Sequence, residues 1–316
     1  MMVTLLGTAG AIAEQRPDGE SAPAVPDELI EQRVAELDDE RFAVRERAKA
    51  ALLEIGKPAV DSLLKAAKSD SPERRIRARE LVEAIRFRSL SGRFQALGDQ
   101  AEEDLDVEHG MWVVALILDP DLEKKTITAR LDAMAAAIRK EIGNAKPASL
   151  PPAKFMEIFT GVLKEDFGLR GDEATYHHPD NSSVHRVMER KKGLPILLSE
   201  IAVAVGRRLE VPIVGLGIPG RYMFKYDGAQ APEGQIKEDI IVDPFGGWVE
   251  VSPAQLAQAI AGFDPRTDLL PSPRRVTLVR MLNNLRSDAF EQRQFRLAEA
   301  VGAYQLLLNP HGFGLP

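Results

Sequence analysis

The sequence predicts an α+β fold in which one buried central helix packs on a small antiparallel sheet, flanked by α-helical repeat-like segments. Three observations lead to this prediction. The stretch 193–209 has the apolar spacing of a helix with a wide buried face. Three short strand-like runs follow it before residue 245, bounded by Pro, Gly or charged residues. Residues 27–88 and 276–309 show helical periodicity.

The central helix is predicted to begin near Gly193 and Pro195. Proline is tolerated in a first helical turn because the N–H that it lacks would be unpaired there anyway. The apolar residues at helical spacing are Leu197, Leu198, Ile201, Ala202, Val205 and Leu209. Arg207 and Arg208 follow in the last turn, where positive charge suits the helix dipole. The runs VPIVGLGIPG, RYMFKY and DIIVDP then predict three strands, the last stopped by Pro244.

A known family matches this central region. The stretch GLRGDEATYHHPDNSSVHRVMERKKGLPILLSEIAVAVGRRLEVPIVGLGIPG, with IIVDPFGG after it, resembles the SirB-type branch of the transglutaminase-like superfamily. The resemblance extends more weakly upstream into DLDVEHGMWVVALILDPDLEKKTITARLDAMAAAI, and downstream into RMLNNLRSDAFEQRQFRLAEAVGAYQLLLNP. It implies a papain-like or transglutaminase-like core, which we expect over residues 104–265.

The resemblance also says where catalytic residues would stand. Active members use a Cys at the start of the helix, a His on the next strand pair and an Asp on the strand after. These positions fall on Pro195, Arg221 and Asp243. The SirB-type branch usually lacks the Cys but tends to keep the His, so this chain departs further than its branch does.

The substitutions remove the chemistry. Proline has no nucleophilic atom, and an arginine stays protonated, so Arg221 cannot act as a general base. The sequence contains no cysteine that could replace the missing thiol. Thiol-dependent acyl transfer is therefore excluded for this chain alone. Arg221 and Asp243 are expected either to form a bidentate ion pair that stiffens the old site, or to leave Arg221 open to a carboxylate or phosphate.

Two function classes follow. In the first, the chain is a catalytically inactive domain that serves as a protein-interaction or scaffold module. In the second, it is a hydrolase or ligand-binding protein that uses the vestigial cleft with Arg221 as an anion clamp. The further binding candidates are Asn181, Arg190, Lys192 and Ser199.

These candidates have plainer interpretations as well. Ser199 beside Glu200 suggests a nucleophile next to an acid, but neighbouring helix positions do not face each other, which favours a core role. Residues 181–183 are expected to cap the following helix. The short basic run at 190–192 is interpreted as a solvated helix end, although it matches the family's basic run before the Gly-x-Pro element.

A metal site is not predicted. His177, His178, Asp180 and His185 lie in the loop before the central helix. Their spacing matches no ligand pattern, and adjacent histidines rarely bind one ion together. We therefore predict no metal and no cofactor.

The remaining segments define the domain organisation. Residues 1–26 are interpreted as a leader, because the small-residue pattern at 11–13 resembles the end of a secretory signal although no basic residue precedes it. Residues 27–88 resemble a HEAT-type helical repeat, with a plain three-helix cap as the alternative. Residues 87–103 are interpreted as a less regular linker, and residues 275–311 as a tetratricopeptide-like helical pair.

Composition limits the partners. The net charge is −7 with both signs interspersed, which argues against nucleic acid. No stretch is long enough to span a membrane. A protein partner is expected, without its identity or the oligomeric state, and the location is either cytoplasmic or, if the leader is a signal, exported.

Overall fold

A computed structural model describes residues 25–231, 233, 237–310 and 312. The signal-like residues 1–13 and nearly all of the predicted leader lie outside this part of the chain. The chain divides into two compact units, Met1–Ile85 and Arg86–Pro316, and the division falls within helix α4 (Pro72–Gly98). Each unit is described by itself below.

The first unit is helical. Before α4 it contains α1 (Asp27–Ala35), α2 (Phe42–Ile55) and α3 (Val60–Ala66). Ile30, Leu52 and Leu63 are among the apolar side chains that form its buried core. The helical periodicity of residues 27–88 is confirmed, and a short turn at Lys57–Ala59 separates α2 from α3. Whether the segment is a HEAT-type repeat or a three-helix cap stays a prediction.

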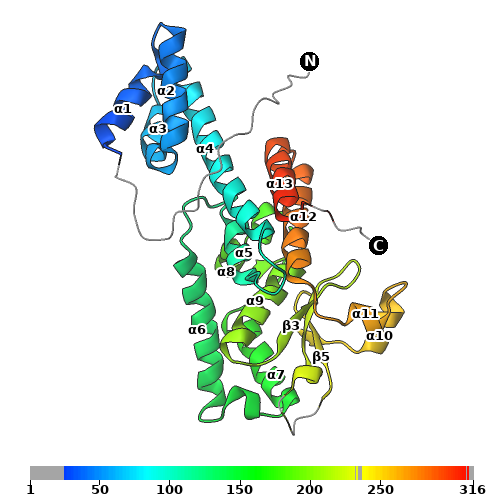
Figure 1. Cartoon of the computed structure of the whole chain (residues 1–316). Coiled ribbons are helices and arrows are strands. Elements are labelled where there is room, and N and C mark those ends of the chain that lie inside the picture. The colour runs from blue at the N-terminus through cyan, green and yellow to red at the C-terminus, as the bar shows by residue number, and fades with distance from the viewer. Residues whose placement is uncertain (1–24, 232, 234–236, 311, 313–316) are drawn as a thin grey trace. The chain divides into compact units, whose positions relative to one another are not determined.

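The second unit combines helices with a small sheet (Figure 1). After the end of α4, its helices are α5 (Val107–Ala115), α6 (Lys124–Ile142), α7 (Pro152–Gly161), α8 (Val184–Arg190), α9 (Pro195–Arg208), α10 (Pro253–Ala259), α11 (Pro265–Asp268), α12 (Arg274–Glu291) and α13 (Phe295–Leu308). No helix in the described residues is both long and apolar enough to cross a membrane.

The predicted strands are confirmed. An antiparallel sheet has the order β3 (Ile213–Leu216), β4 (Met223–Tyr226), β5 (Ile240–Asp243) and β6 (Val249–Glu250). Phe224 pairs with Val242 across β4 and β5, which sets the register. A second, two-residue parallel pair joins β1 (Arg170–Gly171) to β2 (Lys192–Gly193), directly before α9.

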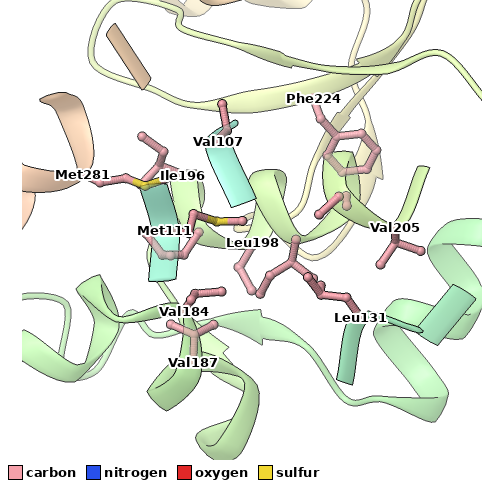
Figure 2. Close-up of a cluster of buried hydrophobic side chains, with 14 of the residues drawn as sticks. Val107, Met111, Leu131, Val184, Val187, Ile196, Leu198, Val205, Phe224 and Met281 are labelled. Carbon is pink, nitrogen blue, oxygen red and sulfur yellow. The ribbon is translucent and has the colours of Figure 1, made fainter. Parts of the chain in front are cut away.

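Helix α9 is the centre of the main core. It packs against β3, β4 and α6, and its six predicted apolar residues are all at most 2 % exposed. Figure 2 shows Ile196, Leu198 and Val205 of α9 in the same buried cluster as Phe224 of β4. At Gly206 a Cβ would lie 2.6 Å from the Ile213 side chain, so the helix and β3 can approach this closely only with glycine there. The predicted central helix on a small antiparallel sheet is confirmed.

The predicted linker at 87–103 is wrong over most of its length. Helix α4 continues to Gly98, because Leu90, Phe94 and Leu97 recur at helical spacing and are at most 8 % exposed. The Phe94 ring stacks on Tyr304 of α13, with centroids 4.8 Å apart. Burial of this face outweighs the weak helix propensity of Ser91 and Gly92, which lie between these residues. The predicted final helical pair is confirmed as α12 and α13, whereas its tetratricopeptide-like character stays a prediction.

Candidate functional site

The site is built where α9 begins. Pro195 is the first residue of α9, and Leu194 precedes it in an extended conformation. The Leu194 N–H donates to the Asn181 carbonyl at 3.4 Å, which ties the helix start to the loop before α8. The residue in the Cys position therefore does begin the buried helix, as predicted, and it contributes only a ring.

Arg221 and Asp243 come together at the ends of neighbouring strands. Arg221 precedes β4, and Asp243 is the last residue of β5. The Arg221 Nη1 lies 4.0 Å from the Asp243 Oδ2, and the two side chains are 49 % and 16 % exposed. This is a long contact and not a bidentate pair, which was the first of the two arrangements expected for these residues. An exposed ion pair of this length stabilises a fold by less than about 1 kcal/mol.

The turn after β5 explains the long contact. The Asp243 Oδ1 accepts hydrogen bonds from the N–H groups of Phe245 and Gly246, both at 3.0 Å. One carboxylate oxygen is thus committed to the turn, which leaves only the other facing Arg221. The Phe245 ring in turn meets the Tyr176 ring edge-on, with centroids 5.7 Å apart. The loop after β1 therefore lies beside this turn.

Three of the predicted binding residues converge on Asp172, a carboxylate that sequence reasoning missed. Asp172 is 3 % exposed. Its Oδ2 lies 3.0 Å from the Arg190 Nη2 and 3.1 Å from the Lys192 Nζ. The Arg190 Nη1 also donates to the Asn181 Oδ1 at 2.9 Å. Burial acts to raise the pKa of Asp172, but hydrogen bonds from Thr175 and Lys192 outweigh it and hold the pKa well below its usual range.

This network gives Asn181, Arg190 and Lys192 an internal role. Their hydrogen-bonding groups hold the loop before α8 against the β1–β2 pair, so fewer of these groups remain to bind a ligand. The signal available in the sequence was a lone Asp in a loop upstream of a basic run.

The expected cap of α8 has a different form. Ser183 is the N-cap residue but makes no side-chain capping bond. Asn181 instead donates to the carbonyls of Thr175 and Tyr176. Ser182 donates to the Asp288 Oδ2 at 2.9 Å. The polar run therefore serves long-range contacts, which outweigh the local capping preference.

The interpretation of Ser199 as a core residue is supported. The adjacent Glu200 takes part in a buried hydrogen-bond network. Ser199 is fully buried. Glu200 is 4 % exposed, and its Oε1 accepts a 2.7 Å hydrogen bond from the Tyr222 hydroxyl, which also contacts the Thr277 Oγ1 at 2.9 Å. Burial raises the pKa of Glu200 to about 7, and the Tyr222 hydrogen bond opposes this shift only in part. A Cβ at Gly215 would collide with this carboxyl group.

The histidines of the loop do not form a metal site. His177 Nδ1 lies 3.2 Å from the Asp288 Oδ1, His178 Nδ1 accepts the Asp180 N–H, and His185 Nε2 lies 3.5 Å from Glu189. Within the described ranges, no group of three or more His, Cys, Asp or Glu side chains is arranged to hold a metal ion. The pairing of His177 with α12 carried no signal in the local sequence.

Among known proteins, a sequence profile of the transglutaminase-like superfamily matches residues 125–283. The chain is 29 % identical over 180 residues to a UPF0162 protein of Xylella fastidiosa (strain 9a5c), covering 53 % of this chain and 59 % of that protein. It is 19 % identical over 211 residues to Protein SirB1 of Salmonella typhimurium, covering 64 % and 73 %. It is 21 % identical over 188 residues to human F-box only protein 21, covering 54 % and 30 %. No solved structure matches this chain.

Proposed function

This chain belongs to the transglutaminase-like superfamily, and we propose that it is a catalytically inactive, SirB-type member that serves as a protein-interaction or scaffold module. The observation that carries the proposal is the identity of the residues at the site: Pro195 at the start of α9, Arg221 before β4 and Asp243 at the end of β5. The chain contains no cysteine. The scaffold of the site is retained, while the atoms that would react are missing.

The physical argument concerns the nucleophile and the base. Acyl transfer in this fold needs a thiolate, which an adjacent imidazole activates. Pro195 supplies no nucleophile and Arg221 no base. Asp243 holds the turn after β5 with one oxygen and lies 4.0 Å from Arg221 with the other. With no histidine beside it, Asp243 has no imidazole to orient, which is the part that the acid of a catalytic triad plays.

The interaction role is supported by exposed aromatic surface. Phe290 and Phe295 are 60 % and 58 % exposed, and their rings meet at 5.4 Å where α12 turns into α13. Exposed aromatic side chains are enriched in protein interfaces. The variant F290S/F295S is expected to lose a specific partner, whereas R221A/D243A is expected to retain it in the same pull-down. Loss only in R221A/D243A would place the interaction at the vestigial site.

Catalysis is tested by rebuilding the triad. Wild type is expected to transfer no fluorescent amine into a glutamine-containing protein and to hydrolyse no thioester above the buffer rate. P195C is expected to gain an alkylatable thiol without turnover, and P195C/R221H to gain slow turnover, because only the double variant has both nucleophile and base. Turnover by wild type that disappears in D243N would overturn the inactive assignment. If P195C/R221H folds but its thiol is no more reactive than free cysteine, the assigned positions are wrong.

A second candidate is an anion clamp at Arg221. Its guanidinium is half exposed, and its carboxylate contact is 4.0 Å long, so it has room for a carboxylate or phosphate ligand. Titration with inorganic phosphate, followed by the arginine side-chain NMR signals, tests this candidate. Saturable shifts of the Arg221 signal that are lost in R221Q would support it.

A further inference from the structure

A surface pocket lies on the loop after β1, apart from Pro195 and the Arg221–Asp243 pair. Its volume is about 430 Å³, and it is lined by residues 173–178 together with Gln292 of the α12–α13 turn. The two segments come together at His177, whose Nδ1 lies 3.2 Å from the Asp288 Oδ1. They are more than a hundred residues apart in the sequence, so only the fold creates this pocket.

Two polar side chains that line the pocket donate hydrogen bonds within the protein. The Thr175 hydroxyl donates to the Asp172 Oδ2 at 2.7 Å. The Gln292 amide donates to the His177 carbonyl at 3.5 Å. The hydroxyl lone pairs of Thr175 and the amide oxygen of Gln292 remain as acceptors, and Glu173 adds an exposed carboxylate.

A buried carboxylate orients the His177 ring. Asp288 is 2 % exposed and accepts a hydrogen bond from Ser182 on its other oxygen. The carboxylate accepts the hydrogen of the His177 Nδ1, so in the neutral form of the ring the Nε2 is the nitrogen with the lone pair. The His177 side chain is 54 % exposed. Burying a carboxylate beneath an exposed imidazole costs stability, which is expected where the ring must keep one orientation.

The lining also contains donors, among them the Tyr176 hydroxyl and the second amide hydrogen of Gln292. The His178 Nδ1 accepts the Asp180 N–H at 3.3 Å, so its Nε2 carries a hydrogen. Arg280 places a positive charge within electrostatic range of Tyr176, but its guanidinium donates to the carbonyls of Ile218 and Arg221. The Glu173 carboxylate is the acidic group of the lining, and it favours a cation over an anion at this pocket.

We propose that this pocket binds a cationic hydrogen-bond donor, an ammonium or guanidinium group, with the His177 Nε2 and the Glu173 carboxylate as its acceptors. Such groups carry only donors, which suits the Glu173 carboxylate and the Nε2 of a neutral His177 ring. The Tyr176 ring, 40 % exposed at the pocket, adds a partner for a cation. The group belongs either to a free small amine or to a Lys or Arg side chain of another protein.

The test is an NMR titration of the full chain at constant ionic strength. The probes are n-butylammonium and ethylguanidinium, with 1-butanol as the uncharged control and acetate and inorganic phosphate as anions. We expect the His177 ring signals to shift saturably with the two cations, with dissociation constants on the order of 1 mM. The blocked tripeptide Gly-Lys-Gly separates the two sources, since tighter binding than butylammonium indicates a protein side chain and equal binding a free amine.

Matched variants assign the binding to His177. H177F is expected to weaken butylammonium about tenfold, the loss of a hydrogen bond to a charged group, while H178F changes it by less than about twofold. E173Q is expected to weaken both cations. D288N is expected to change the tautomer seen in the ¹⁵N ring shifts of His177. If D288N fails to fold, the affinities of H177F and E173Q for the two cations still test the proposal. No saturable binding, equal binding of 1-butanol, tighter binding of the anions or full affinity in H177F would each overturn the proposal.

Discussion

Glu200 is expected to make the stability of the second unit depend on pH, and E200Q should remove that dependence. Burial raises the pKa of this carboxyl group from 4.5 to about 7 in the folded protein, and the Tyr222 hydroxyl at 2.7 Å supplies its hydrogen bond. The unfolded chain keeps the ordinary pKa. Between these two values the folded state therefore binds more protons than the unfolded state does.

The sign and size of the effect follow from this difference. The stabilisation from the protonated carboxyl is fully present below pH 4.5 and is lost as the pH rises through about 7. A shift of roughly 2.5 pKa units corresponds to about 3 kcal/mol in the free energy of unfolding. Gln keeps the shape and stays neutral, so E200Q should match wild type below pH 4.5 and exceed its stability by up to about 3 kcal/mol at pH 8.

The assay is urea unfolding at a series of pH values, followed by tryptophan fluorescence. Trp112 and Trp248 both lie in the second unit, so the signal reports on that unit. The difference between E200Q and wild type cancels the other titrating groups. Y222F is the matched control, because removing this hydrogen bond should move the midpoint of the difference curve to higher pH. A stability difference that does not change between pH 4 and 8 would refute the reasoning.

Two further predictions concern packing and the loop network. D172N should destabilise the second unit by about 2–3 kcal/mol at pH 7, since it leaves Arg190 and Lys192 beside a neutral group. The depressed pKa of Asp172 also means that wild type loses this stability as the pH falls below about 4, so the two urea midpoints should converge in acid. G206A should cost about 1–3 kcal/mol through collision with Ile213, whereas G161A, with open space at its Cβ, should be neutral or stabilising. Equal effects of the two alanines on the thermal midpoint would contradict the close helix–strand approach.

The local periodicity of the apolar residues was sufficient to predict the central helix and the strands of the sheet. The apolar spacing of 197–209 predicts α9, and the strand-like runs predict β3, β4 and β5, because side-chain period reports directly which face is buried. The same period extends to the end of α4. Leu90, Phe94 and Leu97 carry it, and Ser91 and Gly92 between them do not interrupt the helix.

The sequence by itself determined the family, the central helix with its sheet, and the absence of any thiol at Pro195 or elsewhere. Only the tertiary structure decided how the polar groups pair: Arg221 with Asp243 at 4.0 Å, Arg190 and Lys192 with Asp172, and His177 with Asp288. The physical reason is the sequence separation between the residues that interact. A helix or strand is encoded in neighbours a few residues apart, whereas a hydrogen bond between residues 177 and 288 depends on how whole elements pack, and no local pattern records that packing.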